Sequence, residues 1–136
     1  MVLVVSIATM VWLGFSSTMA STGVQKSWPN ERAALVDLAS STRIEHWVRR
    51  RGWLDPGRSV CDWDLVGCNG DGRVKLLTLS FNNLTGTLPE TIGMLEMLED
   101  LDLEYNKLIG TIPDAVGGMA QLIQLGLGGN QFNGRA

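Results

Sequence analysis

The sequence is poor in the side chains that build catalytic and metal centres. Its 136 residues contain one histidine, His46, and two cysteines, Cys61 and Cys68. A structural zinc site needs four ligands, and these thiols have neither a second pair nor a nearby histidine to complete one. No serine or cysteine stands in a recognisable nucleophile setting, and GLGGN at 126–130 is not the GxGxxG pattern of a dinucleotide site. The sequence therefore predicts a protein without catalytic activity, cofactor or metal.

Charge is absent from residues 1–20, which hold the apolar run Val2–Phe15. The run is shorter than the roughly 20 residues that span a bilayer, and the small residues Thr18 and Ala20 fit the positions that flank a cleavage site. We therefore predict a secretory signal peptide over residues 1–20, although the positive charge that usually precedes such a run is missing. The alternative is an uncleaved membrane anchor, because the uncharged stretch reaches Val24 and would span a thin membrane or span at a tilt.

The two cysteines lie close together in the stretch CDWDLVGC, as Cys61 and Cys68. We predict a disulfide between them, which agrees with export into an oxidising compartment. On the chain-entropy model, closing so short a loop contributes about 2 to 3 kcal/mol of stability. Two reduced cysteines in a cytosolic protein are the alternative, and that alternative also requires the signal peptide prediction to be wrong.

Basic and acidic residues are divided along the chain. Residues 21–60 carry seven basic and four acidic residues, a net charge of +3, whereas residues 61–136 carry four basic and ten acidic residues, a net charge of −6. The basic residues are not interleaved with the stacking aromatics or motifs of a nucleic-acid site. We therefore expect no nucleic-acid partner.

The sequence does have a repeat of 24 residues. The positions that recur at this interval are Asn82, Asn106 and Asn130, then Gly86, Gly110 and Gly134, and also Pro89 and Pro113. A fixed period in the twenties is typical of a solenoid that is built from one strand and one return segment per turn.

Each turn of the repeat predicts a short strand with two leucines on its inward face, since residues i and i+2 of a strand point the same way. The pairs are Leu77 with Leu79, Leu101 with Leu103, and Leu125 with Leu127. The asparagine three residues later is placed where the chain leaves the sheet, and its amide can bond backbone groups that lack a partner inside the core. Successive turns would stack Asn82, Asn106 and Asn130 into a ladder. Two equivalent sets of apolar residues are expected to fill the opposite side: Ile92, Leu95 and Leu98, and Val116, Met119 and Leu122.

A helix is expected before the repeats. Asn30 can accept hydrogen bonds from the first turn, and Glu31 suits the positive end of the helix dipole. Apolar residues then follow at helical spacing, and the run Arg49–Arg51 precedes Gly52 as it would at a helix end. NGDG at 69–72 predicts a tight turn before a strand that starts at Val74.

The stretch LxxLDLEYNKLIGTIPDAVGGM, which begins at Leu98, resembles the plant-type extracellular leucine-rich repeat, LxxLxLxxNxLxGxIPxxIGxLxx. The upstream segments ERAALVDL, HWVRRRGWL, CDWDLVGC and GRVKLLTL resemble the amino-terminal cap of that family. The resemblance implies an α/β solenoid, a right-handed superhelix with a parallel concave β-sheet and a helical cap. It divides the chain into a signal peptide at 1–20, a cap at 21–72, and repeats at 73–136, two of them full and one truncated.

The repeat pattern breaks off at GRA, where a third xIP and a carboxy-terminal cap would follow. A solenoid turn buries its core only against neighbours, so an uncapped last turn leaves Leu125, Leu127 and Phe132 partly open. We therefore expect a fragment or truncated product of a longer protein, with a complete small protein as the alternative.

The family resemblance implies a secreted or cell-surface recognition module that binds an unidentified protein or peptide through the concave sheet. The outward strand residues are the contact candidates: Thr78, Ser80, Asp100, Asp102, Glu104, Tyr105 and Gln124. A merely solvated face is the alternative interpretation of the three acids, Asp100, Asp102 and Glu104. If the acids bind, a cationic or amide-rich peptide is the expected partner, with Tyr105 as an amphipathic anchor.

Two other functions stay open. The chain can be the start of the ectodomain of a membrane receptor or receptor kinase. Inhibition of a secreted microbial wall hydrolase is a known use of this repeat class, but no residue here selects it. A membrane is involved only if the first segment stays uncleaved or if a longer chain has a downstream span.

A sequon for N-glycosylation stands at Asn83, Leu84 and Thr85. We predict a glycan on Asn83 if the chain is secreted through a eukaryotic pathway. Its side chain is expected outside the core, because Asn82 takes the inward ladder position.

Overall fold

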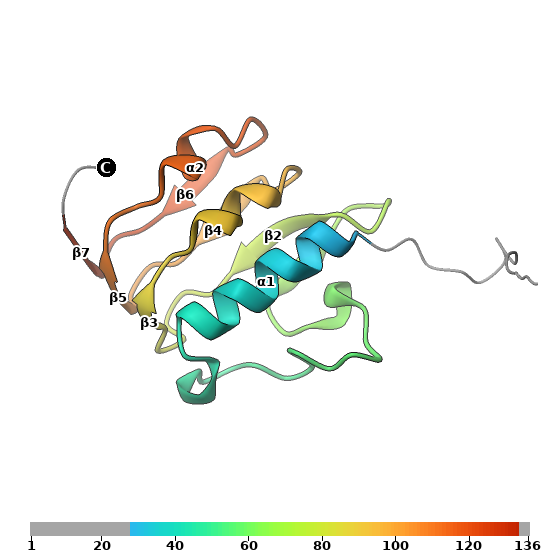
Figure 1. The fold of residues 1–136 in the computed structure, drawn as a ribbon, viewed down its shortest axis with the longest axis horizontal. Coiled ribbons are helices and arrows are strands. Elements are labelled where there is room, and N and C mark those ends of the chain that lie inside the picture. The colour runs from blue at the N-terminus through green and yellow to red at the C-terminus, as the bar shows by residue number, and fades with distance from the viewer. Residues whose placement is uncertain (1–27, 134–136) are drawn as a thin grey trace, which may run out of the picture.

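The computed structural model describes residues 28–133, so the predicted signal peptide or anchor at 1–20 lies outside the described residues. Each turn of the described chain contributes a strand to a main sheet. Figure 1 shows α1 (Pro29–Ser41), the 3-10 turn η3 (Glu90–Met94) and α2 (Asp114–Gly117) in front of three successive strands of that sheet. The helical segments therefore form one layer and the sheet another.

The main sheet has the predicted period of one parallel strand per 24 residues. Its strands are β1 (Val66–Cys68), β2 (Val74–Thr78), β4 (Asp100–Asp102) and β6 (Gln124–Gly126), in the order β1-β2-β4-β6. Strands β2, β4 and β6 are parallel, with Leu77 opposite Leu101 and Leu101 opposite Leu125. The parallel sheet and its register confirm the predicted solenoid.

Strand β1 extends this sheet at the other side of β2, where it pairs antiparallel. The NGDG turn precedes β2, as predicted, and it joins β2 to β1, a strand that the sequence did not predict. Its geometry is held by Asn69, whose Oδ1 accepts hydrogen bonds from the amides of Asp71 and Arg73 at 2.9 and 3.0 Å. Cys61 and Cys68 form a disulfide with a Cα–Cα distance of 5.6 Å, which ties β1 to the preceding 3-10 turn η2 (Val60–Asp62).

A second parallel sheet, which the sequence did not predict, follows the asparagines. It consists of β3 (Thr85–Thr87), β5 (Lys107–Gly110) and β7 (Gln131–Phe132), in the order β3-β5-β7. These strands are two to four residues long, which is too short to show an alternating apolar pattern. Stacking of the turns aligns them and creates the backbone pairs.

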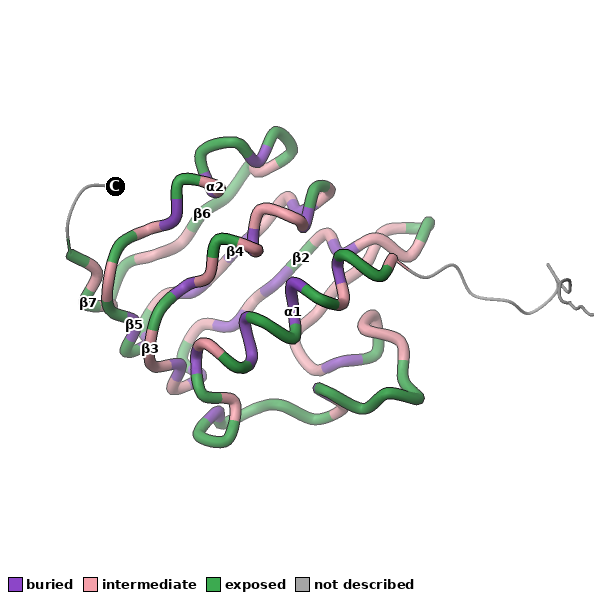
Figure 2. The backbone as a smooth tube through the Cα atoms, in the orientation of Figure 1, coloured by how far each residue is buried: buried purple, intermediate pink, exposed green. Residues whose placement is uncertain are grey.

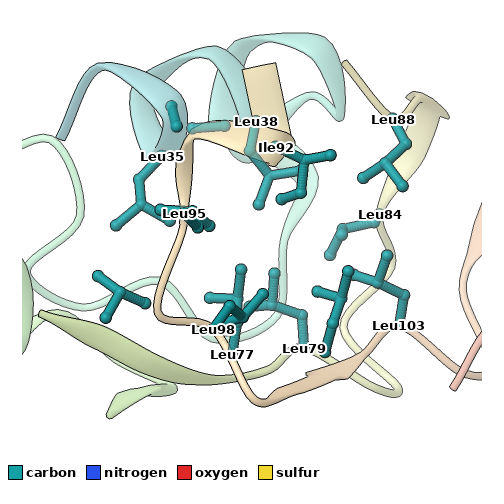
Figure 3. Packing of buried hydrophobic residues seen from close by; sticks show 14 of the residues in the cluster. Leu35, Leu38, Leu77, Leu79, Leu84, Leu88, Ile92, Leu95, Leu98 and Leu103 are labelled. Carbon is teal, nitrogen blue, oxygen red and sulfur yellow. The ribbon is translucent and has the colours of Figure 1, made fainter. Parts of the chain in front are cut away.

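The predicted leucines fill the space between the two layers. Figure 3 shows Leu77, Leu79 and Leu103 facing Leu95 and Ile92 across the core, and all five are fully buried. Leu35 and Leu38 of α1 close the same cluster from the helical side. The last turn is more open, since Leu125 is 42% exposed and β6 has no buried residue (Figure 2). This difference agrees with the expectation for a turn packed on one side only.

The first helix is shorter than expected. Helix α1 ends at Ser41 and a separate 3-10 turn, η1 (Ile44–His46), follows, so the prediction of a helix that reaches Gly52 was wrong. The hydroxyl of Thr42 bonds the Leu38 carbonyl at 2.6 Å, and Arg43 adopts a left-handed φ of 58° that turns the chain away. The Arg49–Arg51 run is exposed and lies beyond the helix rather than at its end.

The start of the helix also differs from the prediction. Trp28 rather than Asn30 takes the N-cap position, with no side-chain cap hydrogen bond. Glu31 is only 1% exposed, and its two oxygens accept hydrogen bonds from the Val74 amide at 2.9 Å and from Arg73 Nε at 2.8 Å. The carboxylate therefore joins α1 to β2.

Candidate functional site

The outward side chains of β2, β4 and β6 form a surface that we call the outer sheet face. Asp100 lies between Leu76 and Gln124 on neighbouring strands, and Asp102 lies between Thr78 and Gly126. The intervening Leu101 and the following Leu103 are fully buried. The alternation places Asp100, Asp102 and Glu104 on the solvent side, where the sequence predicted them.

Four of the candidate residues share one hollow. Asp100, Asp102, Glu104 and Gln124 line a depression of about 390 Å³ together with Leu125 and Gly126. Thr78 and Ser80 are half-buried and do not line it, and Tyr105 lines a different depression. The structure thus gathers the acids and Gln124 but separates them from the other candidates.

Gly126 is the residue that leaves room for this hollow. A Cβ at position 126 would lie 2.9 Å from Glu104 Cγ and 3.1 Å from Asp102 Oδ1. Asp102 Oδ1 also accepts a hydrogen bond from the Glu104 amide at 3.0 Å, which orients the carboxylate. Asp102 and Glu104 can therefore extend over β6, because Gly126 has no side chain that would exclude them.

The carboxylates of the hollow are available to a cationic partner. Within residues 28–133, no lysine or arginine forms an ion pair with Asp100, Asp102 or Glu104. Lys75 pairs instead with Glu99, at 3.7 Å. Adjacent acids along a strand stand about 7 Å apart, within a Debye length of roughly 8 Å at physiological salt, so their fields add.

An aromatic pair lies where the strands leave the main sheet. Phe81 and Tyr105 stack with ring centroids 4.6 Å apart, and they remain 70% and 55% exposed. Both have left-handed φ angles, 54° and 56°, as has Gly129 at the equivalent place of the next turn. Tyr105 was among the candidates predicted from the sequence and Phe81 was not, although the 24-residue spacing between them could have revealed it.

The asparagines form a continuous hydrogen-bonded ladder beneath this pair. Asn106 Oδ1 accepts hydrogen bonds from the amides of Asn82 and Leu84, both at 3.0 Å. Its Nδ2 donates to the carbonyls of Leu79 and Leu103, both at 2.9 Å. The ladder locks successive turns in register, and so it fixes the spacing of the outer sheet face.

The outer rungs of the ladder bond to different parts of the chain. Asn130 repeats the pattern one turn later, since its Oδ1 accepts from the Leu108 amide at 3.0 Å and its Nδ2 donates to Leu103 O at 2.8 Å. At the other end of the ladder, Asn82 Oδ1 accepts a hydrogen bond from the Arg49 amide at 2.6 Å, and Asn82 Nδ2 donates one to the Arg49 carbonyl at 3.0 Å. The first rung therefore fastens the segment around Arg49 to the repeats.

Asn83 lies outside the ladder and is half-exposed. Its φ is 61°, and its Nδ2 donates a hydrogen bond to the His46 carbonyl at 3.0 Å. The side chain thus points away from the core and toward the last residue of η1.

The described part of the chain shows neither a metal centre nor a membrane span. No group of three or more histidine, cysteine, aspartate or glutamate residues within residues 28–133 has the arrangement to hold a metal ion. Among the same residues, no helix has the length and apolar character needed to cross a bilayer.

Comparison with known proteins finds similar chains among the ectodomains of plant receptors. A family model described as leucine rich repeat matches residues 72–132. Phytosulfokine receptor 2 of Arabidopsis thaliana is 35% identical over 81 residues, which cover 57% of this chain and 8% of the receptor. The chain spans about a tenth of the length of the curated relatives that it matches.

Two solved structures from Arabidopsis thaliana share the fold. The BIR2 ectodomain matches with a TM-score of 0.70 and 25% identity, over 83% of this chain and 60% of that chain. The ectodomain of the receptor kinase GASSHO1/SCHENGEN3, in complex with CASPARIAN STRIP INTEGRITY FACTOR 2, matches with a TM-score of 0.67 and 30% identity, over 75% and 12% of the two chains. Residues 72–132 of this chain are leucine-rich repeats, and they are similar to the repeats of plant receptor ectodomains.

Proposed function

We propose that this chain is an extracellular recognition module that binds a peptide or protein segment through the outer sheet face. The observation that carries the proposal is the hollow over Gly126, whose carboxylates form no ion pair within residues 28–133 and offer concentrated negative charge on a rigid support. A solved relative is in complex with CASPARIAN STRIP INTEGRITY FACTOR 2, and this supports a peptide or protein ligand here. The favoured ligand is basic or rich in amides.

The remaining parts of the chain have supporting roles in this proposal. Residues 1–20 direct export, residues 21–72 cap the first turn, and residues 73–136 form the binding repeats. The fully buried residues of α1 and the Asn82 contacts with Arg49 support the capping role, because they cover the first turn of the solenoid. Export would place the module outside the cell or on its surface.

A receptor ectodomain is the second candidate function. The names of the curated relatives favour it, since they are receptors or receptor-like kinases of which this chain matches a small part. Sequencing the transcript beyond codon 136 tests it directly. A second apolar span encoded downstream would support a receptor, and a stop codon at that point would support a separate module.

Charge reversal tests the proposed binding surface. A displayed library of random peptides, selected against the exported chain, is expected to become enriched in lysine and arginine. Binding of the enriched pool should fall at least tenfold, and depend less on salt, when Asp102 and Glu104 are both replaced by lysine.

The matched control carries the same change of charge elsewhere. Asp37 and Asp114 are exposed on α1 and α2, so their replacement by lysine adds equal charge away from the outer sheet face. This control variant should bind as the parent does. Equal binding by the Asp102→Lys, Glu104→Lys variant, with its fold intact by circular dichroism, would place the working surface elsewhere.

A further inference from the structure

The sequence FNNLT at 81–85 places an aromatic residue two positions before a glycosylation sequon. Asn82 between them is buried in the ladder, whereas Phe81 and Asn83 both have left-handed φ angles and carry their side chains outside. Phe81 and Asn83 line one depression of about 550 Å³, together with Val48 and Tyr105. The acceptor amide and the exposed ring therefore face the same space.

Phe81 is only partly covered in the part of the chain that the structure describes. One face of its ring stacks on Tyr105, and the residue stays 70% exposed. Val48, which is 71% exposed, lies at the same depression and adds apolar surface to it. An exposed apolar surface of this kind gains free energy when it is covered.

The amide of Asn83 is oriented toward that depression. Its Nδ2 donates a hydrogen bond to the His46 carbonyl, two residues before Val48. A glycosylated asparagine keeps one N–H, so this hydrogen bond can persist and hold the attached sugar near Phe81 and Val48.

We infer that Asn83 carries an N-linked glycan whose first sugar lies against the open face of Phe81, an inference that rests on the proposed export of the chain. The donor is a polyprenyl diphosphate-linked oligosaccharide. Its anomeric C–O bond breaks, a bond from that carbon to Asn83 Nδ2 forms, the diphosphate leaves with the electron pair, and the amide loses one proton to solvent. A pyranose ring has an apolar face of C–H groups, which suits the π face of an aromatic ring.

The glycan has a consequence for ligand binding. It covers the depression at Val48 and Phe81 but leaves the carboxylate hollow over Gly126 open, because different residues line the two depressions. A ligand on the outer sheet face therefore approaches from the acidic side.

Thr85 provides an unglycosylated control with little disturbance of the fold. Its Oγ1 is buried and has no hydrogen-bond partner within residues 28–133. Replacement by valine removes the sequon and also removes a buried hydroxyl that makes no bond, so it leaves Phe81 and Asn83 in place. Phe81→Asn removes the ring with a residue that tolerates the left-handed conformation.

The experiment compares four full chains from a plant secretory host: the parent, Thr85→Val, Phe81→Asn, and the double variant. The intact mass of each chain shows whether the glycan is present. The midpoint temperature of thermal unfolding measures how much the glycan stabilises the fold. The glycosylated parent should unfold roughly 2 to 4 °C above Thr85→Val, and this difference should fall below about 1 °C when Phe81 is absent. Two control chains carry Phe81→Trp, which keeps a ring, with and without Thr85→Val, and this pair should retain the difference.

Each outcome decides the inference. A secreted parent without added mass rules out the site, and an equal thermal difference in both backgrounds rules out the contact with Phe81. The same four chains are also made with a proven secretory leader in place of residues 1–20. A glycan that forms only with this leader would contradict the proposed export while supporting the inference about Asn83.

Discussion

At the scale of single residues, the ladder asparagines do most to fix the geometry of the repeats. Asn106 is buried and bonds backbone groups in two successive turns, whereas Asn130 makes similar bonds in a half-buried position. Loss of a buried partner leaves backbone groups unsatisfied, which costs about 1 to 3 kcal/mol per group in a dry site. The same amide should therefore matter more in the middle turn than in the last.

Replacement of Asn106 by alanine is expected to lower the free energy of unfolding by about 3 kcal/mol. The equivalent change at Asn130 should cost about 1 kcal/mol, because water reaches the groups that it leaves behind. Urea unfolding, monitored by tryptophan fluorescence, measures both changes in the free energy of unfolding. Asn133→Ala, at an exposed position, is the control and should change the free energy by less than about 0.5 kcal/mol. Equal losses of stability for the Asn106 and Asn130 variants would contradict the argument that the more buried asparagine contributes more.

At the scale of elements, one buried carboxylate connects α1 to the main sheet. We expect Glu31→Ala to destabilise the protein by about 2 to 3 kcal/mol, since it removes two hydrogen bonds to a charged group and leaves the Val74 amide without a partner. Chemical denaturation provides the measurement. The half-exposed Lys75–Glu99 pair is the control, and Lys75→Ala should change stability by less than about 1 kcal/mol. A larger effect at Lys75 than at Glu31 would argue against this role of the helix contact.

The disulfide acts on a second element, the short hairpin of β1 and β2. The exported protein should show a mass two hydrogens below that of its reduced form. Replacing both Cys61 and Cys68 by serine should lower the free energy of unfolding by about 2 to 3 kcal/mol. Labelling of both thiols in the native protein without reductant would disagree with the bond seen between them.

At the scale of the whole molecule, we expect the protection of backbone amides from hydrogen exchange to decrease toward the last described turn. Leu101 of β4 is buried between strands on both sides, while within residues 28–133 β6 and β7 have a neighbouring strand on one side only. Local opening costs less where fewer apolar contacts are buried. Amide hydrogen exchange, read by mass spectrometry, should be slower for peptides from 98–110 than for peptides from 122–132. Uniform exchange across both segments would show that the solenoid opens as a single cooperative unit.

The sequence alone determined the features that repeat. The 24-residue period predicted the parallel strands, the buried leucines and the positions of the asparagines, because each of these depends on local alternation and on an identical neighbour one turn away. The outward placement of Asp100, Asp102 and Glu104 followed from the same alternation.

Only the tertiary structure decided the features that depend on distant or unlike segments. Glu31 meets Val74 across 43 residues, and no local pattern reveals that a carboxylate at the start of a helix is buried there. The gathering of the acids over Gly126 depends on a missing side chain one turn later, and the stacking of Phe81 on Tyr105 depends on two left-handed residues in adjacent turns. Periodicity specifies which way a residue points along its own strand, whereas the surface that a ligand or glycan meets is made by side chains from several turns packed together.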